Sequence, residues 1–154
     1  MKHFGYCLLF LFFLSPGIFA HCQVPCGIYT DDLRIRTIFE HIDTIEKAMV
    51  KIGELSSVEK INFNQLVRWI NVKEQHAHEI QTIISEYFLI QRLKIPASGE
   101  LTDAYVNQLV TLHSILIEAM KTKQTTDLGH CLKLRELVRE FSKMYFSEDD
   151  LKHL

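Results

Sequence analysis

The chain has 154 residues, with 17 Lys and Arg against 19 Asp and Glu, so its formal net charge at pH 7 is −2. A mildly acidic chain with no basic tract gives no reason to expect a nucleic-acid partner. Three prolines, six glycines and the absence of repeats or low-complexity segments are typical of a compact helical domain. The length allows one such domain and is too short for two.

Residues 1–20 have the pattern of a secretory signal peptide. Lys2 supplies the positive start, an apolar run follows, and a Ser-Pro-Gly sequence precedes Ala20. The apolar run is shorter than the about 20 residues that span a bilayer. We predict that a leader peptidase cuts after Ala20. The mature domain, residues 21–154, is then exported to the periplasm or secreted, or enters an organellar lumen, and keeps no membrane attachment. An uncleaved anchor is the alternative.

The next nine residues, which we call the hook, concentrate metal donors: His21-Cys22-Gln23-Val24-Pro25-Cys26-Gly27-Ile28-Tyr29. Cleavage after Ala20 would free the α-amine of His21. This amine, the amide nitrogen and sulfur of Cys22 and the sulfur of Cys26 can form a square plane, with the His21 imidazole as axial ligand. Square-planar ligation favours Ni(II) or Cu(II), because zinc prefers a tetrahedron.

The two hook cysteines and Tyr29 each allow a second interpretation. Exported proteins normally pair their cysteines, so a Cys22–Cys26 disulfide would serve as a structural loop closure. Tyr29 can donate a hydrogen bond toward an open axial face of the metal, or it can pack the hook onto the first helix. The third cysteine of the mature chain, Cys131, lies among leucines and is expected to be a small buried side chain.

Apolar residues that recur at steps of three and four predict four helices after the hook. The apolar positions run over 35–52, about 57–92, 101–116 and 134–145. Short connections and almost no strand pattern then indicate an all-α fold, an antiparallel four-helix bundle over about residues 30–147 with an irregular N-terminal metal-binding hook.

Turn and cap residues separate these helices. Gly53 marks the end of the first helix, and Ser56 with Glu59 matches a capping box for the second. A Pro-Ala-Ser-Gly sequence at 96–99 ends the second helix, and residues 125–127 offer N-caps for the fourth.

Metal ligation inside the bundle is disfavoured by the histidine pattern. A carboxylate-bridged di-metal oxidase needs Glu-x-x-His pairs, and the chain has none. His76 and His78 are two apart on one helix, so they point in nearly opposite directions. The other helical histidines, His41, His113 and His130, are expected to be exposed or hydrogen-bonded.

The hook resembles the nickel hook of the nickel-containing superoxide dismutases at the mature N-terminus and at six sequence positions, namely His21, Cys22, Pro25, Cys26, Gly27 and Tyr29. The segments 73–75 and 85–88 also resemble segments of that family. The resemblance implies a four-helix bundle and one nickel ion per subunit, held by His21, Cys22 and Cys26. It further implies that Tyr29 lines the substrate approach, and that the subunits assemble as a homohexamer.

The activity implied is the conversion of two superoxide anions and two protons to dioxygen and hydrogen peroxide, with cycling between Ni(III) and Ni(II). His21, Cys22, Cys26 and Tyr29 are then the catalytic residues. The alternative is a module that binds or delivers nickel or copper without turnover. A third hypothesis is a secreted helical interaction protein with a Cys22–Cys26 disulfide.

The resemblance also has departures. Gln23 stands where many family members have Asp, and Arg36 and His76 stand near the positions of the Glu and Arg that hold the axial imidazole in the family. The residues that orient His21 are therefore expected to differ here, and side chains that hydrogen-bond to a metal ligand tune metal affinity and potential.

Overall fold

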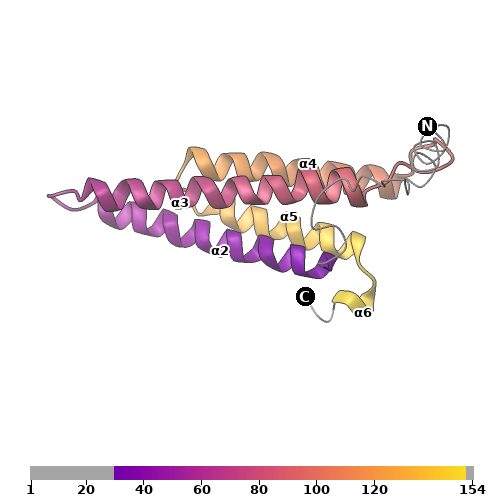
Figure 1. Cartoon of the computed structure of the whole chain (residues 1–154), viewed down its shortest axis with the longest axis horizontal. Helices are drawn as coiled ribbons and strands as arrows, with labels where there is room; N and C mark the ends of the chain where they lie inside the picture. Colours follow the sequence, from indigo (N-terminus) through magenta and orange to yellow (C-terminus); the bar gives the residue numbers. More distant parts are fainter. Residues whose placement is uncertain (1–29, 152–154) are drawn as a thin grey trace, which may run out of the picture.

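The computed structural model describes residues 30–151, which form an antiparallel helical bundle (Figure 1). The elements follow one another as α2 (Asp31–Ser56), α3 (Phe63–Thr82), its continuation η1 (Ile83–Arg92), α4 (Asp103–Gln124), α5 (Gly129–Tyr145) and the short α6 (Glu148–Leu151). Consecutive helices pack together, and α5 also packs on α2, so the four-helix ring is closed. Since residues 30–151 contain no strand, the expected all-α bundle is confirmed.

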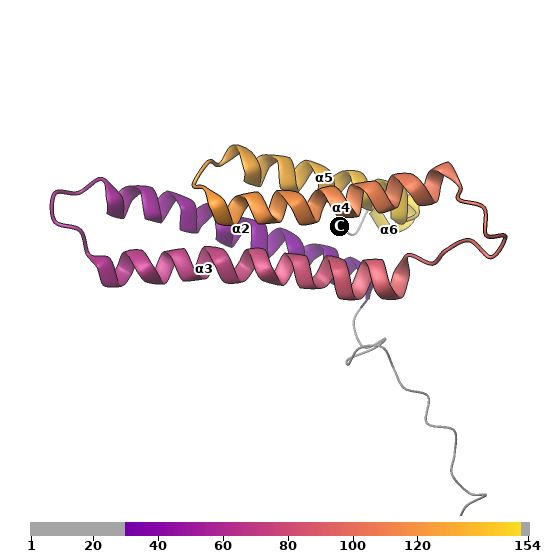
Figure 2. The ribbon, with the colours of Figure 1, turned by 90° about the horizontal axis from the view of Figure 1, so that it is seen from above.

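The two ends of the bundle differ. The α2–α3 hairpin projects beyond the turn between α4 and α5 at one end (Figure 2). At the other end the start of α2, the end of η1, the end of α5 and α6 come together. The hook joins the bundle at this second end, through Thr30. None of the helices within residues 30–151 is long and apolar enough to cross a bilayer.

Many of the apolar positions predicted from the sequence form the core. Ile35, Ile38, Ile42 and Ile45 of α2 are fully buried, as are Ile80, Phe88, Leu112, Ile115, Leu134 and Val138 from the other helices. Phe88 and Phe141 lie edge to face with ring centroids 5.1 Å apart, a contact worth about 0.5–1.5 kcal/mol beyond area burial. Periodicity located the core only in part, because six positions that belong to the predicted apolar stripes are exposed: Phe63, Val67, Ile70, Leu101, Val106 and Leu109.

Cys131 is fully buried, as expected, and its sulfur lies 3.6 Å from the sulfur of Met49. Burial, with a smaller contribution from the Glu46 carboxylate, raises the pKa of the Cys131 thiol to about 11. The thiol is therefore protonated near neutral pH, and a protonated thiol is not a metal ligand.

The ends of the helices differ from the sequence prediction in one instructive place. The first helix continues past Gly53 to Ser56, and the second begins at Phe63 rather than near residue 57. Ser56 does not cap the second helix, because it is still the last residue of α2, where its hydroxyl donates to the carbonyl of Ile52, 2.7 Å away. The cap of α3 is instead Asn62, which accepts from the amide of Gln65.

The second helix changes its winding at Ile83. In η1 the backbone bonds join residues five apart, as in the 2.8 Å bond from the Leu93 amide to the Phe88 carbonyl. This wider winding keeps Ile84, Tyr87 and Phe88 buried and brings residues five apart, such as Tyr87 and Arg92, onto one side of the helix.

A buried lysine closes the end of α4. The Lys73 ammonium donates to the carbonyls of Thr122 (2.9 Å), Thr125 (3.2 Å) and Lys123, and lies 3.5 Å from a Glu74 carboxylate oxygen. The carbonyls at the C-terminus of a helix carry partial negative charge and lack hydrogen-bond donors within the helix. The Lys73 ammonium supplies both a positive charge and the donors.

Replacing Lys73 by Met keeps most of the side-chain volume and removes the three donors to the end of α4. We expect the free energy of unfolding to fall by about 2–3 kcal/mol, because hydrogen bonds from a charged group are lost and the carbonyls at the end of α4 are left without their donor. Denaturant unfolding measures this loss, with the exposed Lys47→Met as the matched control. Equal effects of the two substitutions would contradict the capping role.

Candidate functional site

The predicted metal ligands His21, Cys22 and Cys26, and Tyr29 beside them, lie outside the described residues, and their roles stay predictions. Within residues 30–151 no group of three or more His, Cys, Asp or Glu side chains is placed to hold a metal ion. The described cysteine, Cys131, is buried and protonated. The described bundle therefore offers no thiolate as a metal ligand.

One carboxylate organises the end of the bundle where the hook is attached. Asp31, the first residue of α2, accepts a 2.6 Å hydrogen bond from the Tyr145 hydroxyl of α5 and another from the Tyr87 hydroxyl of η1. Its Oδ1 lies 3.0 Å from Nε of Arg92, also in η1. We call these four residues the Asp31 junction, because they join α2, η1 and α5 at one point.

The wide winding of η1 explains how two of these residues cooperate. Arg92 follows Tyr87 by five positions, and its Nη2 donates to the Tyr87 hydroxyl oxygen over 2.7 Å. The same guanidinium lies 4.8 Å from the Tyr87 ring centroid. In an α-helix residues five apart point in different directions, so the junction requires the π-type turn.

Both tyrosines of the junction keep their protons well above neutral pH. Burial and the hydrogen bond to Asp31 raise the pKa of Tyr87, and the same two causes raise the pKa of Tyr145 further. Ionising either phenol would place a second negative charge beside the Asp31 carboxylate. Both phenols of the junction therefore stay protonated, and both donate a hydrogen bond to the Asp31 carboxylate.

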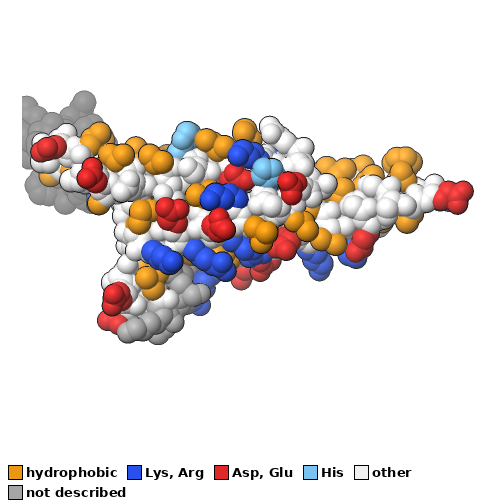
Figure 3. Space-filling model, turned by 180° about the vertical axis from the view of Figure 1, so that it is seen from behind, with side chains coloured by type: hydrophobic (Ala, Val, Ile, Leu, Met, Phe, Trp, Pro, Cys, Tyr) orange, Lys and Arg blue, Asp and Glu red, His pale blue; other side chains and the backbone are white. Residues whose placement is uncertain are grey.

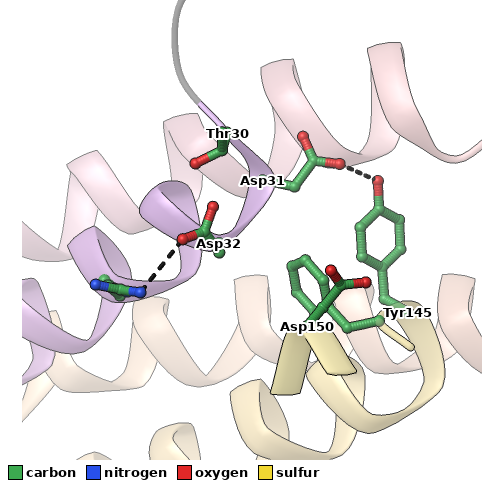
Figure 4. Close-up of a pocket in the computed structure, with 7 residues that line it drawn as sticks. Thr30, Asp31, Asp32, Tyr145 and Asp150 are labelled. Carbon is green, nitrogen blue, oxygen red and sulfur yellow. Dashed lines mark hydrogen bonds and ion pairs between the residues drawn. The ribbon is translucent and has the colours of Figure 1, made fainter. Parts of the chain in front are cut away.

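A surface pocket of about 690 Å³ opens beside the junction (Figure 4). Its walls are Thr30, Asp31, Asp32, Arg36, Tyr145, Phe146 and Asp150. Asp31 points toward the Tyr145 hydroxyl, and Asp32 pairs with Arg36 at 3.3 Å. Three carboxylates against one guanidinium give this pocket no attraction for an anion.

A second pocket, of about 550 Å³, shares Arg36 with the first, and half of its lining residues are cations. Arg135, Arg139 and Lys143 of α5 face Arg36 and Glu40 of α2 across it. Arg135 is paired with Asp43 and Glu46, so the net positive charge comes mainly from Arg139 and Lys143. Lys and Arg side chains also gather beside α6 in Figure 3.

The helical histidines are hydrogen-bonded or exposed, as expected. His130 Nδ1 lies 2.5 Å from Oε1 of Glu118, and His113 is exposed. Burial opposes ionisation of Glu118, but its hydrogen bonds from His130 and Lys121 outweigh this effect and lower its pKa. His41 faces His76 across α2 and α3, and burial followed by the charge of His76 lowers the pKa of His41.

The two positions that depart from the family pattern have their own partners in the bundle. Arg36 pairs with Asp32, and His76 with His41, so they lie in separate contacts of α2 and α3. Sequence reasoning missed the Asp31 junction entirely. The sequence analysis did not single out Asp31, because no local pattern connects it with residues 56 and 114 positions away.

Removing the Tyr145 hydroxyl tests the junction. We expect Tyr145→Phe to lower the free energy of unfolding by about 1–2 kcal/mol, since a hydrogen bond to a charged acceptor is lost while the ring stays. Thermal or denaturant unfolding gives the value, with Tyr105→Phe of α4 as a control outside the junction. A loss of the same size in both variants would rule out a special role for the junction.

Comparison with known protein families gives one match. Residues 17–149 match the model of a family described as nickel-containing superoxide dismutase. The matched segment contains the hook and almost all of the described bundle. No curated protein and no solved structure gave a significant match.

Proposed function

Since the chain belongs to the nickel-containing superoxide dismutase family, we propose that the hook, residues 21–29, is its catalytic nickel centre. The protein is a nickel-dependent oxidoreductase that acts on superoxide. The observation that carries the proposal is the donor sequence of the hook inside the matched segment. The described bundle adds no competing set of three ligands.

In this proposal the amine and imidazole of His21, the amide nitrogen and thiolate of Cys22 and the thiolate of Cys26 hold one nickel ion per subunit. When bound, nickel supplies one-electron exchange between Ni(III) and Ni(II), which converts two superoxide anions and two protons to dioxygen and hydrogen peroxide. Tyr29 lines the approach of the substrate. A leader peptidase that cuts after Ala20 creates the amine ligand.

The bundle's own residues contribute position and charge. The Asp31 junction fixes the first turn of α2, two residues after Tyr29, against η1 and α5. A fixed attachment point limits where the metal donors can lie, and misplacement by about 1 Å is costly in catalysis. The cations Arg139 and Lys143 near the same end supply the local attraction for an anion that the net acidic chain lacks.

Two further parts of the proposal concern the environment of the protein. The leader at 1–20 supports export to the periplasm or secretion, with an organellar lumen as the remaining option. A homohexamer is supported by apolar side chains exposed along α4, namely Val106, Val110, Ile117 and Met120. Figure 3 shows hydrophobic side chains on this side of the bundle and at the α2–α3 tip. Such surfaces are typical of contacts between subunits.

The role of the hook thiolates is tested by Cys26→Ser in the mature protein. We expect nickel content and superoxide turnover to fall to the level of the metal-free protein, because a hydroxyl is a poor substitute for a thiolate donor. Metal analysis and the rate of superoxide decay give both values. Cys131→Ala is the matched control and keeps its nickel and turnover. Turnover retained by Cys26→Ser would refute the assignment.

The role of the basic pocket is tested by combining Arg139→Gln with Lys143→Gln. We expect kcat/KM to drop about 3- to 10-fold at low ionic strength and the difference to shrink in high salt, where charges are screened. The control makes the same charge change remotely, with Lys47→Gln and Lys60→Gln. An equal drop in the control, or a drop that salt does not reduce, would exclude steering by this pocket.

A further inference from the structure

Two histidines on neighbouring helices face each other away from the hook. Nδ1 of His41 in α2 lies 2.8 Å from Nδ1 of His76 in α3, and the ring centroids are 4.9 Å apart at an interplanar angle of 62°. Both side chains are half-buried. His41 follows Asp31 by ten residues, which is about 15 Å along a helix. The pair is therefore separate from the Asp31 junction.

The distance between the two nitrogens is that of two neighbouring ligands on one metal ion. Bonds of about 2.0–2.1 Å meeting at a right angle place two nitrogens about 2.9 Å apart, and a tetrahedral angle places them about 3.3 Å apart. The observed 2.8 Å is closer to the right angle. Right-angled positions occur in square-planar and octahedral ions, which include Ni(II) and Cu(II).

Burial and the charge of His76 lower the pKa of His41, so its ring is neutral, as a metal ligand must be. Glu79 of α3 and Glu40 of α2 are the acidic groups that act on His41 from the two helices. Two rings that both carried protons at these nitrogens would repel each other at this distance. Without a metal, one neutral ring donates its Nδ1 proton to Nδ1 of the other, which accounts for the 2.8 Å separation. A metal ion would displace that proton to solvent and bind both lone pairs, since imidazole binds metals in its neutral form.

We propose that His41 and His76 form a second site for a divalent transition-metal ion, such as Ni(II) or Cu(II), distinct from the hook. Because no third His, Cys, Asp or Glu within residues 30–151 completes a ligand group, water fills the other positions. The site is then weaker and more exchangeable than the hook. An ion held here also ties α2 to α3 and stabilises the folded bundle by mass action.

The site is tested in a protein whose hook is disabled by His21→Ala, Cys22→Ser and Cys26→Ser, so the outcome does not depend on the hook proposal. Equilibrium dialysis against Ni(II) at neutral pH should give one saturable ion per subunit, together with a rise in the melting temperature. Mg²⁺ should not bind, because it prefers oxygen ligands.

Adding His76→Ala to this background should raise the Kd for Ni(II) at least about tenfold and abolish the rise in melting temperature, because the second ligand is no longer tethered. His78→Ala, at an exposed position of the same helix, is the matched control and should change neither value. Circular dichroism in the far ultraviolet checks that each variant is folded. If His76→Ala is unfolded, the same two measurements on His41→Gln replace it. Absence of saturable binding, or unchanged binding in both ligand variants, would overturn the proposal.

Discussion

The Asp31 carboxylate joins three helices at the point where the proposed metal centre enters the bundle. It accepts hydrogen bonds from Tyr87 and Tyr145 and pairs with Arg92, while it also lies in the first turn of α2, where the helix dipole favours a negative charge. The hook donors lie between five and ten residues upstream in the sequence. Asp31 and its partners therefore fix the first turn of α2, which is the described segment nearest to the hook in the sequence.

That carboxylate would have fewer partners without the change of winding in η1. A π-type helix has poorer intrinsic stability than an α-helix, and such turns are frequent at functional sites. Here the wider turn buries Tyr87 and Phe88 and at the same time places Arg92 over the Tyr87 ring. Packing of Phe88 with Phe141 and Tyr145 offsets the cost of the irregular backbone.

The sequence predicts well those features that arise from local periodicity and from adjacent donors. The burial of Ile35, Ile38 and Ile42 follows from helical spacing, and the dense donors of the hook follow from their order in the chain. The Asn62 cap was missed because the preceding helix extends through Ser56 and consumes its hydroxyl. The Asp31 junction and the His41–His76 contact join residues far apart in sequence, so only the packed bundle reveals them.

The central claim is that cleavage at one peptide bond completes a nickel centre in the hook. Native mass spectrometry of the protein isolated from its source tests this claim, because one spectrum gives the mass of the subunit, its N-terminus, its metal content and its assembly. We expect a subunit that begins at His21, carries one tightly held nickel ion and assembles as six copies. A nickel-loaded, active subunit that begins at any other residue would contradict it.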